Sequence, residues 1–347
     1  MELRIDNIIV KHWGRKNTVL TKTYLDKIPV VYVDLCMHYL RLNKSIHYDA
    51  LVKNDYSVYN EYITTTNQKE HSELQFKTLL KEWDVNKMEK IKFGFDNNIM
   101  CIIDGVHRAS IYIYATGKKG IPVKYLNITY PDDVLSEISN ALIKTTTTQH
   151  YNGWSNKRAP HGYHSFNLFN INFEGQRNPK MRLDIMRKHY TFDDKYIIDL
   201  GCNTGGMLFH CLEMKKGQGF DFDKFCIDAC NTIKNKMQIY DAINFSQIDL
   251  DKEDQAAIFR DGRADVVFLL SLGSWVKKWK DLYKLVIENA DTIFLETNND
   301  NEGKPQLILI ETHGCKIEMI AESSNDDITK NTLRKMYKIT TPNCKGV

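Results

Sequence analysis

Long apolar runs are missing from this 347-residue sequence. No stretch approaches the roughly 18 consecutive apolar residues that a membrane-spanning helix requires. The first thirty residues include Glu2, Arg4 and Lys11, and they lack the apolar centre of a secretory signal. Hydrophobic residues make up 42% of the chain and charged residues 26%, a balance typical of folded globular proteins. We therefore expect a folded cytoplasmic protein without a membrane span.

Closely spaced cysteine pairs are also missing. The eight cysteines form no C-x-x-C motif. Cys226 and Cys230 lie four residues apart on an expected helix and could form half of a metal site, but such cysteines are more often small buried side chains. We expect free thiols, as in a reducing compartment, and no bound metal.

A strong excess of charge of one sign is absent as well. The formal net charge of +3 does not by itself indicate a nucleic-acid partner, so any basic surface would have to be local. Two groups of basic residues could form such a surface, namely Lys11, Arg15 and Lys16, and Lys277, Lys278 and Lys280.

The most informative stretch is YIIDLGCNTGG, at residues 196–206. A short apolar run followed at once by clustered glycines predicts a buried parallel strand, a tight turn and the start of a helix near Gly206. Glycines accept unusual backbone angles, and without side chains they would let a nucleotide-like ligand lie against the main chain. The first N–H groups of the helix would face that ligand. The spacing differs from the dinucleotide fingerprint G-x-G-x-x-G, because Asn203 occupies a glycine position.

Acidic residues stand at the ends of three successive predicted strands. These residues are Asp199, Asp221 and Asp249. An acid at the tip of the second strand can accept hydrogen bonds from both ribose hydroxyls, which is the role we expect for Asp221. Residues 264–270 are nearly all apolar, as in a central parallel strand, and residues 316–320 and 334–339 are expected to form a closing antiparallel hairpin.

This pattern resembles motif I and the following strands of the class I S-adenosylmethionine-dependent methyltransferases, with Asn203 where glycine is commoner. The resemblance covers the C-terminal half and implies a Rossmann-like α/β domain with a seven-stranded sheet and S-adenosyl-L-methionine as cofactor. Asp249 would contact the adenine amino group, and Arg182 would bind the methionine carboxylate unless it forms a surface salt bridge. The cofactor-binding residues expected from the resemblance are Arg182, Asp199, Gly201, Cys202, Asn203, Gly205, Asp221, Phe222, Asp249, Leu250 and Ser271.

A second informative stretch is NIMCIIDGVHRASIYIY, at residues 98–114. It predicts a strand, a turn at Asp104-Gly105 and a helix that opens at His107 and Arg108, and such a polar helix N-terminus suits an anion such as phosphate. The pattern D-G-x-H-R resembles the signature of ParB/sulfiredoxin-like domains. This resemblance implies an N-terminal α+β domain with Asp104, Gly105, His107 and Arg108 at a nucleotide or phosphate site. In the alternative, the domain is a non-catalytic recognition module in which these residues only hold the loop.

The sequence thus predicts three segments, which are a ParB-like domain at 1–143, a linker and lid at 144–182, and a methyltransferase domain at 183–347. In the lid, His161 or His164 could remove the proton of the acceptor, because imidazole titrates near neutrality; alternatively, both satisfy hydrogen bonds of the loop. Glu296, at the carboxyl end of a predicted strand, is a further candidate base.

Methyl transfer requires a positioned acceptor, exclusion of water and removal of one proton. A magnesium-assisted variant would need acids near residues 271–275, which contain none. The two joined domains resemble proteins of glycan pathways, so we expect O-methylation of a sugar hydroxyl on a nucleotide sugar or glycan, with Tyr151, Trp154, Tyr163 and Trp275 available for stacking on the sugar. The alternatives are an RNA methyltransferase, a bifunctional enzyme whose N-terminal domain handles a nucleotide phosphate, and a cofactor-binding regulator without transfer activity.

Overall fold

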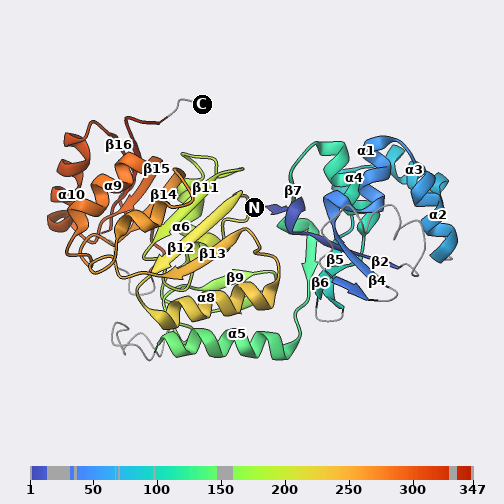
Figure 1. Ribbon diagram of the computed structural model, residues 1–347, viewed down its shortest axis with the longest axis horizontal. Helices are drawn as coiled ribbons and strands as arrows, with labels where there is room; N and C mark the ends of the chain where they lie inside the picture. The colour runs from blue at the N-terminus through green and yellow to red at the C-terminus, as the bar shows by residue number, and fades with distance from the viewer. Residues whose placement is uncertain are drawn as a thin grey trace. The chain divides into compact units, whose positions relative to one another are not determined.

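The chain divides into two compact units. The computed structural model describes residues 2–13, 32–34, 37–66, 68, 71–96, 99–146, 159–327 and 334–344 (Figure 1). The first unit comprises Met1–Pro131 with Met237–Ile239, and the second comprises Asp132–Lys236 with Tyr240–Val347. The division falls after Pro131, whereas the sequence placed it after residue 143, and the described part of the predicted linker belongs to the second unit.

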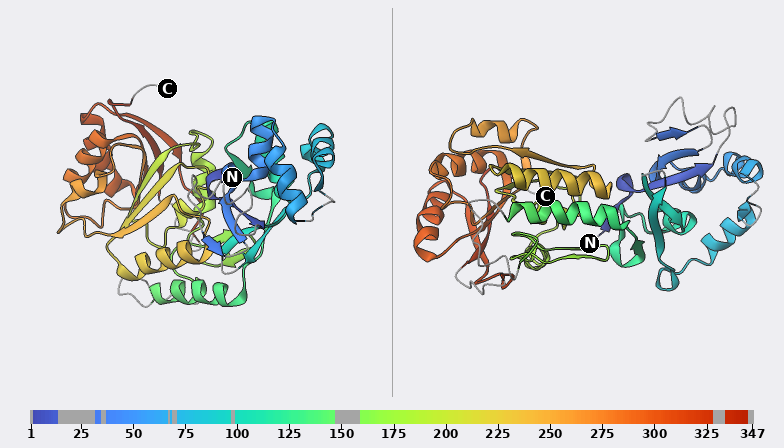
Figure 2. Two further views of the ribbon diagram at one scale, coloured as in Figure 1. Left: turned by 45° about the vertical axis from the view of Figure 1, so that its right-hand side comes forward. Right: turned by 90° about the horizontal axis from the view of Figure 1, so that it is seen from below.

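Helix α5 (Asp132–Thr145) is responsible for this difference. It lies beside α8 (Lys224–Met237) in the views of Figures 1 and 2. The Nζ atom of Lys236 on α8 is 2.5 Å from the Oε2 atom of Glu137 on α5. Because α5 packs with α8, it is part of the second unit and not the last helix of the first.

The first unit is built on a mixed six-stranded sheet in the order β3-β4-β2-β6-β5-β8. Its strands are β2 (Ile9–Trp13), β3 (Tyr32–Asp34), β4 (Met37–Arg41), β5 (Ile91–Asp96), β6 (Ile99–Asp104) and β8 (Leu126–Ile128). A separate antiparallel pair consists of β1 (Glu2–Arg4) and β7 (Gly120–Pro122). The helices are α1 (Ile46–Lys53), α2 (Ser57–Thr66), α3 (Glu73–Lys81) and α4 (Val106–Thr116), with 3-10 turns η1 (Ile5–Asn7), η3 (Leu42–Lys44), η5 (Val85–Lys87) and η6 (Val123–Tyr125).

The strand, turn and helix predicted at residues 98–114 are present as β6 and α4. Gly105 caps the start of α4 with a φ of +98°, and Gly117 caps its end with a φ of +65°. Both angles lie in the left-handed region, which glycine adopts without strain. The two glycines therefore fix where α4 begins and ends.

The second unit contains a seven-stranded sheet in the order β13-β12-β11-β14-β15-β17-β16. The first five strands in this order are parallel, and β17 runs antiparallel between β15 and β16. The strands are β11 (Tyr196–Leu200), β12 (Lys216–Asp221), β13 (Ile243–Gln247), β14 (Ala264–Leu270), β15 (Ala290–Glu296), β16 (Lys316–Ala321) and β17 (Met336–Thr340). The predicted closing hairpin corresponds to β16 and β17.

Helices and a small hairpin complete the second unit. The helices besides α5 and α8 are α6 (Pro179–Met186), α7 (Gly206–Phe209), α9 (Trp279–Asn289) and α10 (Asp300–Thr312), with the 3-10 turn η8 (Gln255–Phe259). The hairpin pairs β9 (Phe166–Leu168) with β10 (Ile171–Phe173). Within the described ranges, no helix combines the length and apolar character needed to cross a membrane.

The parallel strands of this sheet end at one common edge. Central strand β14 contributes Val266 to Leu269, which are at most 1% exposed, and it pairs on either side with β11 and β15. The residues that end the five parallel strands are Leu200, Asp221, Gln247, Leu270 and Glu296. In open α/β sheets ligands bind beyond the carboxyl ends of the strands, so the loops after these residues are the candidate site.

Candidate functional site

The loop between β11 and α7 turns through left-handed backbone at three positions. Gly201, Asn203 and Gly205 have φ angles of +72°, +47° and +71°. Asparagine tolerates this region better than most residues, which explains why Asn203 can stand at a glycine position. The Asn203 N–H donates to Oδ2 of Asp221 at 2.8 Å, and its carbonyl accepts from Sγ of Cys230 at 3.3 Å. These bonds tie the loop to β12 and α8.

Two glycines of this loop make room for protein side chains. A Cβ atom on Gly205 would lie 2.8 Å from the Phe245 ring, and one on Gly206 would lie 2.6 Å from Cβ of His164. The Gly206 N–H, which was expected to face a ligand, donates instead to Nδ1 of His164 at 3.3 Å. Packing inside the protein thus requires glycine at these two positions.

One carboxylate oxygen of Asp199 receives no hydrogen bond from the described residues. Its side chain is at the end of β11 and 2% exposed. Its buried Oδ2 atom has no hydrogen-bond partner among the residues that the structure describes. Burial and the neighbouring Asp221 raise the pKa of Asp199 to about 7, although Arg182 acts to lower it. Because an unsatisfied buried acceptor costs free energy, this oxygen is suited to a donor from a ligand.

Asp221, the last residue of β12, is at the predicted strand tip. Its carboxylate accepts the N–H groups of Asn203 at 2.8 Å and Asp223 at 2.9 Å. Burial raises its pKa, and these bonds partly offset the effect. The backbone N–H of Phe222 also bonds to this carboxylate, so about one of its four acceptor positions remains for a further donor such as a ribose hydroxyl.

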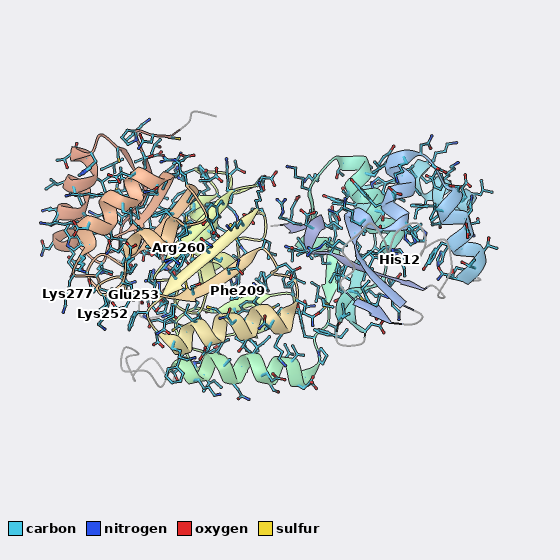
Figure 3. The ribbon with its side chains drawn as sticks, viewed as in Figure 1. His12, Phe209, Lys252, Glu253, Arg260 and Lys277 are labelled. Atoms are coloured by element: carbon cyan, nitrogen blue, oxygen red, sulfur yellow. The ribbon has the colours of Figure 1, made fainter. Side chains whose placement is uncertain are left out.

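Other predicted cofactor residues have varied surroundings. Phe222 is 48% exposed, whereas Leu250 and Cys202 are buried. Asp249 accepts the N–H of Asp251 at 3.1 Å and pairs with Lys252 at 2.7 Å, and Lys252 lowers the pKa of Asp249. Lys252 is labelled in Figure 3. The Asp249 carboxylate is therefore engaged within its own turn, which weakens the case for the predicted adenine contact.

A buried ion cluster, formed by Arg177, Arg182, Glu296 and Asp326, lies next to the edge of the sheet. Arg177 Nη2 lies 3.0 Å from Glu296 Oε1 and 2.6 Å from Asp326 Oδ1. Arg182 Nη2 lies 3.0 Å from Glu296 Oε2, and its Nε lies 2.9 Å from Asp326 Oδ2. All four side chains are at most 2% exposed. Asp327 Oδ2 lies 3.5 Å from Arg177 Nη1, and Arg334 Nη1 lies 3.7 Å from Glu296 Oε2, so three positive and three negative charges balance around this cluster.

This cluster contains two residues for which the sequence predicted a role in the site, namely Glu296 as a base and Arg182 as a cofactor ligand. Each carboxylate oxygen of Glu296 faces an arginine, and Ser271 Oγ also bonds to it. A general base needs a free acceptor atom within hydrogen-bond reach of the proton that it removes from the substrate. Both oxygens of Glu296 are already bonded, so this arrangement favours a structural role for Glu296. Arg182 likewise pairs with protein carboxylates, which argues against its predicted role toward the methionine carboxylate.

The two candidate histidines have protein partners as well. His164 is 4% exposed, its Nδ1 accepts from Gly206, and burial lowers its pKa well below the usual value. The Nε2 atom of His161 lies 3.1 Å from Oγ of Ser139 on α5, and its ring packs 4.8 Å from that of Phe173. The contact of His164 favours the alternative interpretation, in which it satisfies a hydrogen bond of the loop. Nδ1 of His161 is buried and has no hydrogen-bond partner among the described residues.

Tyr163 belongs to a polar group that the sequence did not reveal. Nη1 of Arg334 lies 3.2 Å from the Tyr163 hydroxyl oxygen and 3.2 Å from Oγ of Ser271, the first residue after β14. Burial raises the pKa of Tyr163, but Arg177, Arg182 and Arg334 together bring it below the ordinary value. Tyr163 is thus held beside the exit of β14 in surroundings that favour its ionised form.

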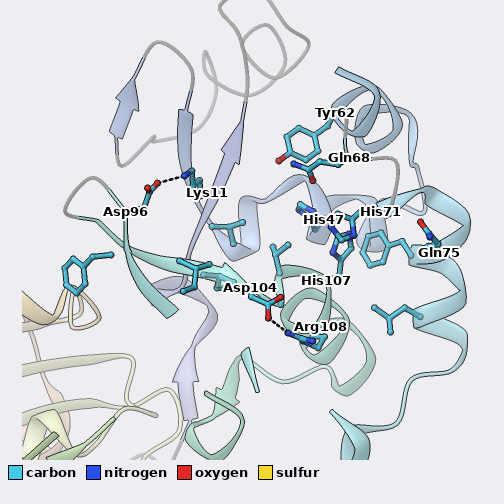
Figure 4. A pocket seen from close by; sticks show the side chains of 18 residues that line it. Lys11, His47, Tyr62, Gln68, His71, Gln75, Asp96, Asp104, His107 and Arg108 are labelled. Atoms are coloured by element: carbon cyan, nitrogen blue, oxygen red, sulfur yellow. Dashed lines mark ion pairs between the residues drawn. The ribbon is translucent and has the colours of Figure 1, made fainter. Parts of the chain in front are cut away.

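The predicted phosphate residues of the first unit come together around a cavity of about 660 Å³ (Figure 4). Asp104, Gly105, His107 and Arg108 all line it. Arg108, however, is paired with acids, since its Nη1 lies 2.7 Å from Glu89 Oε2 and its Nη2 lies 3.1 Å from Asp104 Oδ2. His107 bonds to the Tyr59 hydroxyl at 2.8 Å, and burial lowers its pKa to about 3.

The cysteine pair considered in the sequence has no metal-binding neighbours. Cys226 and Cys230 are buried, and Cys230 bonds to the Asn203 carbonyl. Across the described parts of the chain, no group of three or more His, Cys, Asp or Glu side chains is arranged to hold a metal ion.

Comparisons with known proteins find similarity in solved structures only. No protein-family model and no curated protein matches the chain. The N-terminal domain of EvdMO1, solved with S-adenosylhomocysteine and D-fucose, is 13% identical over 53% of this chain and 93% of its own, with a TM-score of 0.41. The methyltransferase domain of bacterial CtHen1-C is 14% identical over 47% and 97%, with a TM-score of 0.38. WbdD with a kinase inhibitor is 16% identical over 60% and 47%, with a TM-score of 0.43.

None of these similarities decides the activity, because identities are below 20% and TM-scores below 0.5. A proposed function must therefore be argued from the strand order and the residue contacts of this chain. Of the residues that matter for those contacts, sequence reasoning missed Arg177, Asp326 and Arg334. The only local signal for them is Asp326-Asp327 in a polar loop, and such pairs are common on solvated surfaces.

Proposed function

We propose that the second unit is a Rossmann-like, seven-stranded methyltransferase domain that binds S-adenosyl-L-methionine. The single observation that supports this best is the unpaired Oδ2 of Asp199, buried where β11 meets the glycine loop. It lies at the carboxyl edge of a sheet in which β11 and β12 are neighbours, so Asp199 and Asp221 stand at adjacent strand tips. One ligand can reach both carboxylates.

The residues at this edge fit the cofactor. Asp199 would pair with its cationic amino group, because an ionised carboxylate accepts charge-assisted hydrogen bonds. Asp221 would accept a ribose hydroxyl with its remaining acceptor position. Phe222, 48% exposed just after Asp221, would offer its ring to the adenine. When bound, S-adenosyl-L-methionine supplies a methyl group on a sulfonium centre.

Tyr163 is our candidate for accepting the proton of the acceptor hydroxyl. Of the bases expected from the sequence, His164 accepts the Gly206 N–H with Nδ1 and Glu296 is paired with two arginines. His161 bonds to Ser139 on α5 through Nε2, while its buried Nδ1 has no hydrogen-bond partner among the described residues. The hydroxyl of Tyr163 is held by Arg334 beside Ser271, and the three nearby arginines stabilise a negative charge on its oxygen. The arginines would thus lower the pH at which the phenolate forms.

The proposed acceptor is a sugar hydroxyl of a nucleotide sugar or glycan. Trp275, 71% exposed after β14, offers an aromatic face for stacking on a pyranose ring. Tyr151 and Trp154, which the sequence also suggested for stacking, lie outside the described residues.

RNA remains the second candidate acceptor, because Lys277, Lys278 and Lys280 are exposed next to Trp275. Binding through phosphates would fall steeply with salt concentration, whereas binding of a neutral sugar would not. Arg15 and Lys16, from the other predicted basic group, lie outside the described residues. A regulator without transfer activity would bind the cofactor but yield no methylated product with either class of acceptor.

Calorimetric titration of the full chain with S-adenosylhomocysteine tests the cofactor site. We expect binding by the wild type and a loss of about 1–3 kcal/mol of binding free energy in Asp221→Ala, the cost of leaving hydroxyl donors unpaired. Asp228→Ala is the matched control, since Asp228 pairs with Lys224 on the surface. Absence of binding by the wild type would overturn the proposed function, and equal affinities in all three proteins would remove Asp221 from the site.

A further inference from the structure

The cavity of the first unit has the size of a small-molecule site. Its volume of about 660 Å³ lies within the range of ligand pockets. Residues from α1, α3, α4, β2 and β6 line it, and Figure 4 shows His47, His71 and His107 grouped on one side. Nothing in the proposed methyl transfer uses this cavity, which belongs to the other unit.

The charges in the wall of the cavity cancel. Lys11 Nζ lies 2.7 Å from Asp96 Oδ2, and Arg108 Nη2 lies 3.1 Å from Asp104 Oδ2, and all four residues line the cavity. The two pairs are the dashed contacts in Figure 4. A phosphate group at either pair would have to displace the carboxylate that already neutralises the lysine or the arginine. The wall therefore favours an uncharged ligand over the predicted anion.

Two imidazoles in the wall, those of His47 and His107, are neutral near pH 7. Burial, with the nearby histidines as a smaller cause, lowers the pKa of His47 well below its usual value, and burial lowers that of His107. A neutral imidazole offers one donor and one acceptor. His47 is 3% exposed, and its Nδ1 has no hydrogen-bond partner among the described residues. This nitrogen is a buried polar atom that a ligand can satisfy.

Aromatic side chains also line the cavity. Phe76 and Phe95 line the same cavity as the histidines, and the centres of the Phe76 and His107 rings are 4.7 Å apart. Rings of this kind cover an apolar ligand face, while neighbouring amides and imidazoles bond to hydroxyls that both donate and accept. The Gln75 amide also lines the cavity.

We propose that this cavity binds an uncharged monosaccharide unit, with His47 and His71 bonding to its hydroxyls and Phe76 packing against its ring. The first unit then recognises a carbohydrate independently of the cofactor site. The sequence signature D-G-x-H-R serves in this interpretation to pair Arg108 with Asp104 and to hold the loop, as the non-catalytic alternative anticipated.

Saturation-transfer difference NMR on the full chain tests the proposal with methyl glycosides of glucose, galactose, mannose and N-acetylglucosamine. Inorganic phosphate, ADP and adenosine are the competing probes. We expect at least one glycoside to bind and its affinity to fall at least tenfold in His71→Ala, whose side chain is exposed, and in His47→Phe, which keeps an aromatic ring but removes the polar atoms. His313→Ala, in the second unit, is the matched control and should bind as the wild type does.

Three outcomes would overturn the proposal. They are binding of phosphate, ADP or adenosine without any glycoside, binding of no probe at all, and glycoside binding that both cavity variants retain. The last outcome would assign the sugar to another site, such as the proposed acceptor site. Asp221→Ala should leave glycoside binding unchanged, so failure of the methyltransferase proposal and failure of this one give different results.

Discussion

Asp199 combines deep burial with an unfilled acceptor, and this combination should make cofactor binding depend on pH. Because its pKa is about 7, the carboxylate is largely protonated at pH 6 and largely ionised at pH 8. If the ionised form binds the cationic amino group, affinity for S-adenosylhomocysteine should rise about tenfold between these pH values, the equivalent of one pKa unit. Calorimetry at both pH values measures the change.

Asp199→Asn should bind more weakly and lose this pH dependence. The pKa of Asp199 is raised on folding, so the folded state holds more protons than the unfolded state between about pH 4 and 7. The contribution of Asp199 to stability therefore falls as pH rises through that window. Without ligand, the Asn variant should be more stable than the wild type at pH 8. A wild-type affinity that is the same at pH 6 and pH 8 would contradict the proposed pairing.

Tyr163 is the second residue with a specific expected effect. Tyr163→Phe removes the hydroxyl that Arg334 holds, and kcat should fall by about 10²–10⁴, the usual contribution of acid–base catalysis. Binding of S-adenosylhomocysteine should not change, which separates a loss of chemistry from a loss of structure. Tyr196→Phe, at the start of β11, is the control. A kcat within threefold of the wild type would exclude Tyr163 as the base.

At the scale of elements, the buried ion cluster joins α6, the end of β15 and the loop before β17. Glu296→Gln leaves Arg177 and Arg182 without their shared carboxylate charge, and breaking such a buried pair costs about 3–5 kcal/mol. Urea unfolding measures this loss. Asp228→Asn breaks only an exposed pair with Lys224 and should change stability little. Unchanged stability of Glu296→Gln together with lost activity would instead restore Glu296 as a candidate base.

At the scale of the whole molecule, the two units should respond separately to the cofactor. A ligand at 100 times its Kd stabilises the unit that binds it by about 2.7 kcal/mol, which shifts Tm by about 5–10 °C for a domain of this size. Differential scanning calorimetry of the full chain should show two transitions, of which S-adenosylhomocysteine raises only one. A single transition, or an equal shift of both, would show that the units unfold together.

The sequence by itself determined the local elements around the candidate site. An apolar run followed by glycines gave the strand β11 and its turn, and a nearly all-apolar run gave the central strand β14. Asp199 and Asp221 were predictable at strand ends, because their positions depend on neighbouring residues in the chain. The helix at Gly206 was also expected, and α7 begins there and ends at Phe209.

Only the tertiary structure decided which side chains are free. Arg182 and Glu296 each had a plausible ligand role in the sequence, but they lie 114 residues apart and pair with each other in the fold. Likewise, Gly206 accommodates His164, 42 residues before it, and Lys11 meets Asp96 across the first unit. A charge or a lone pair is available to a ligand only if no other segment satisfies it. Whether another segment satisfies it depends on strand order and on contacts between residues distant in the sequence. A local sequence pattern carries no information on these contacts.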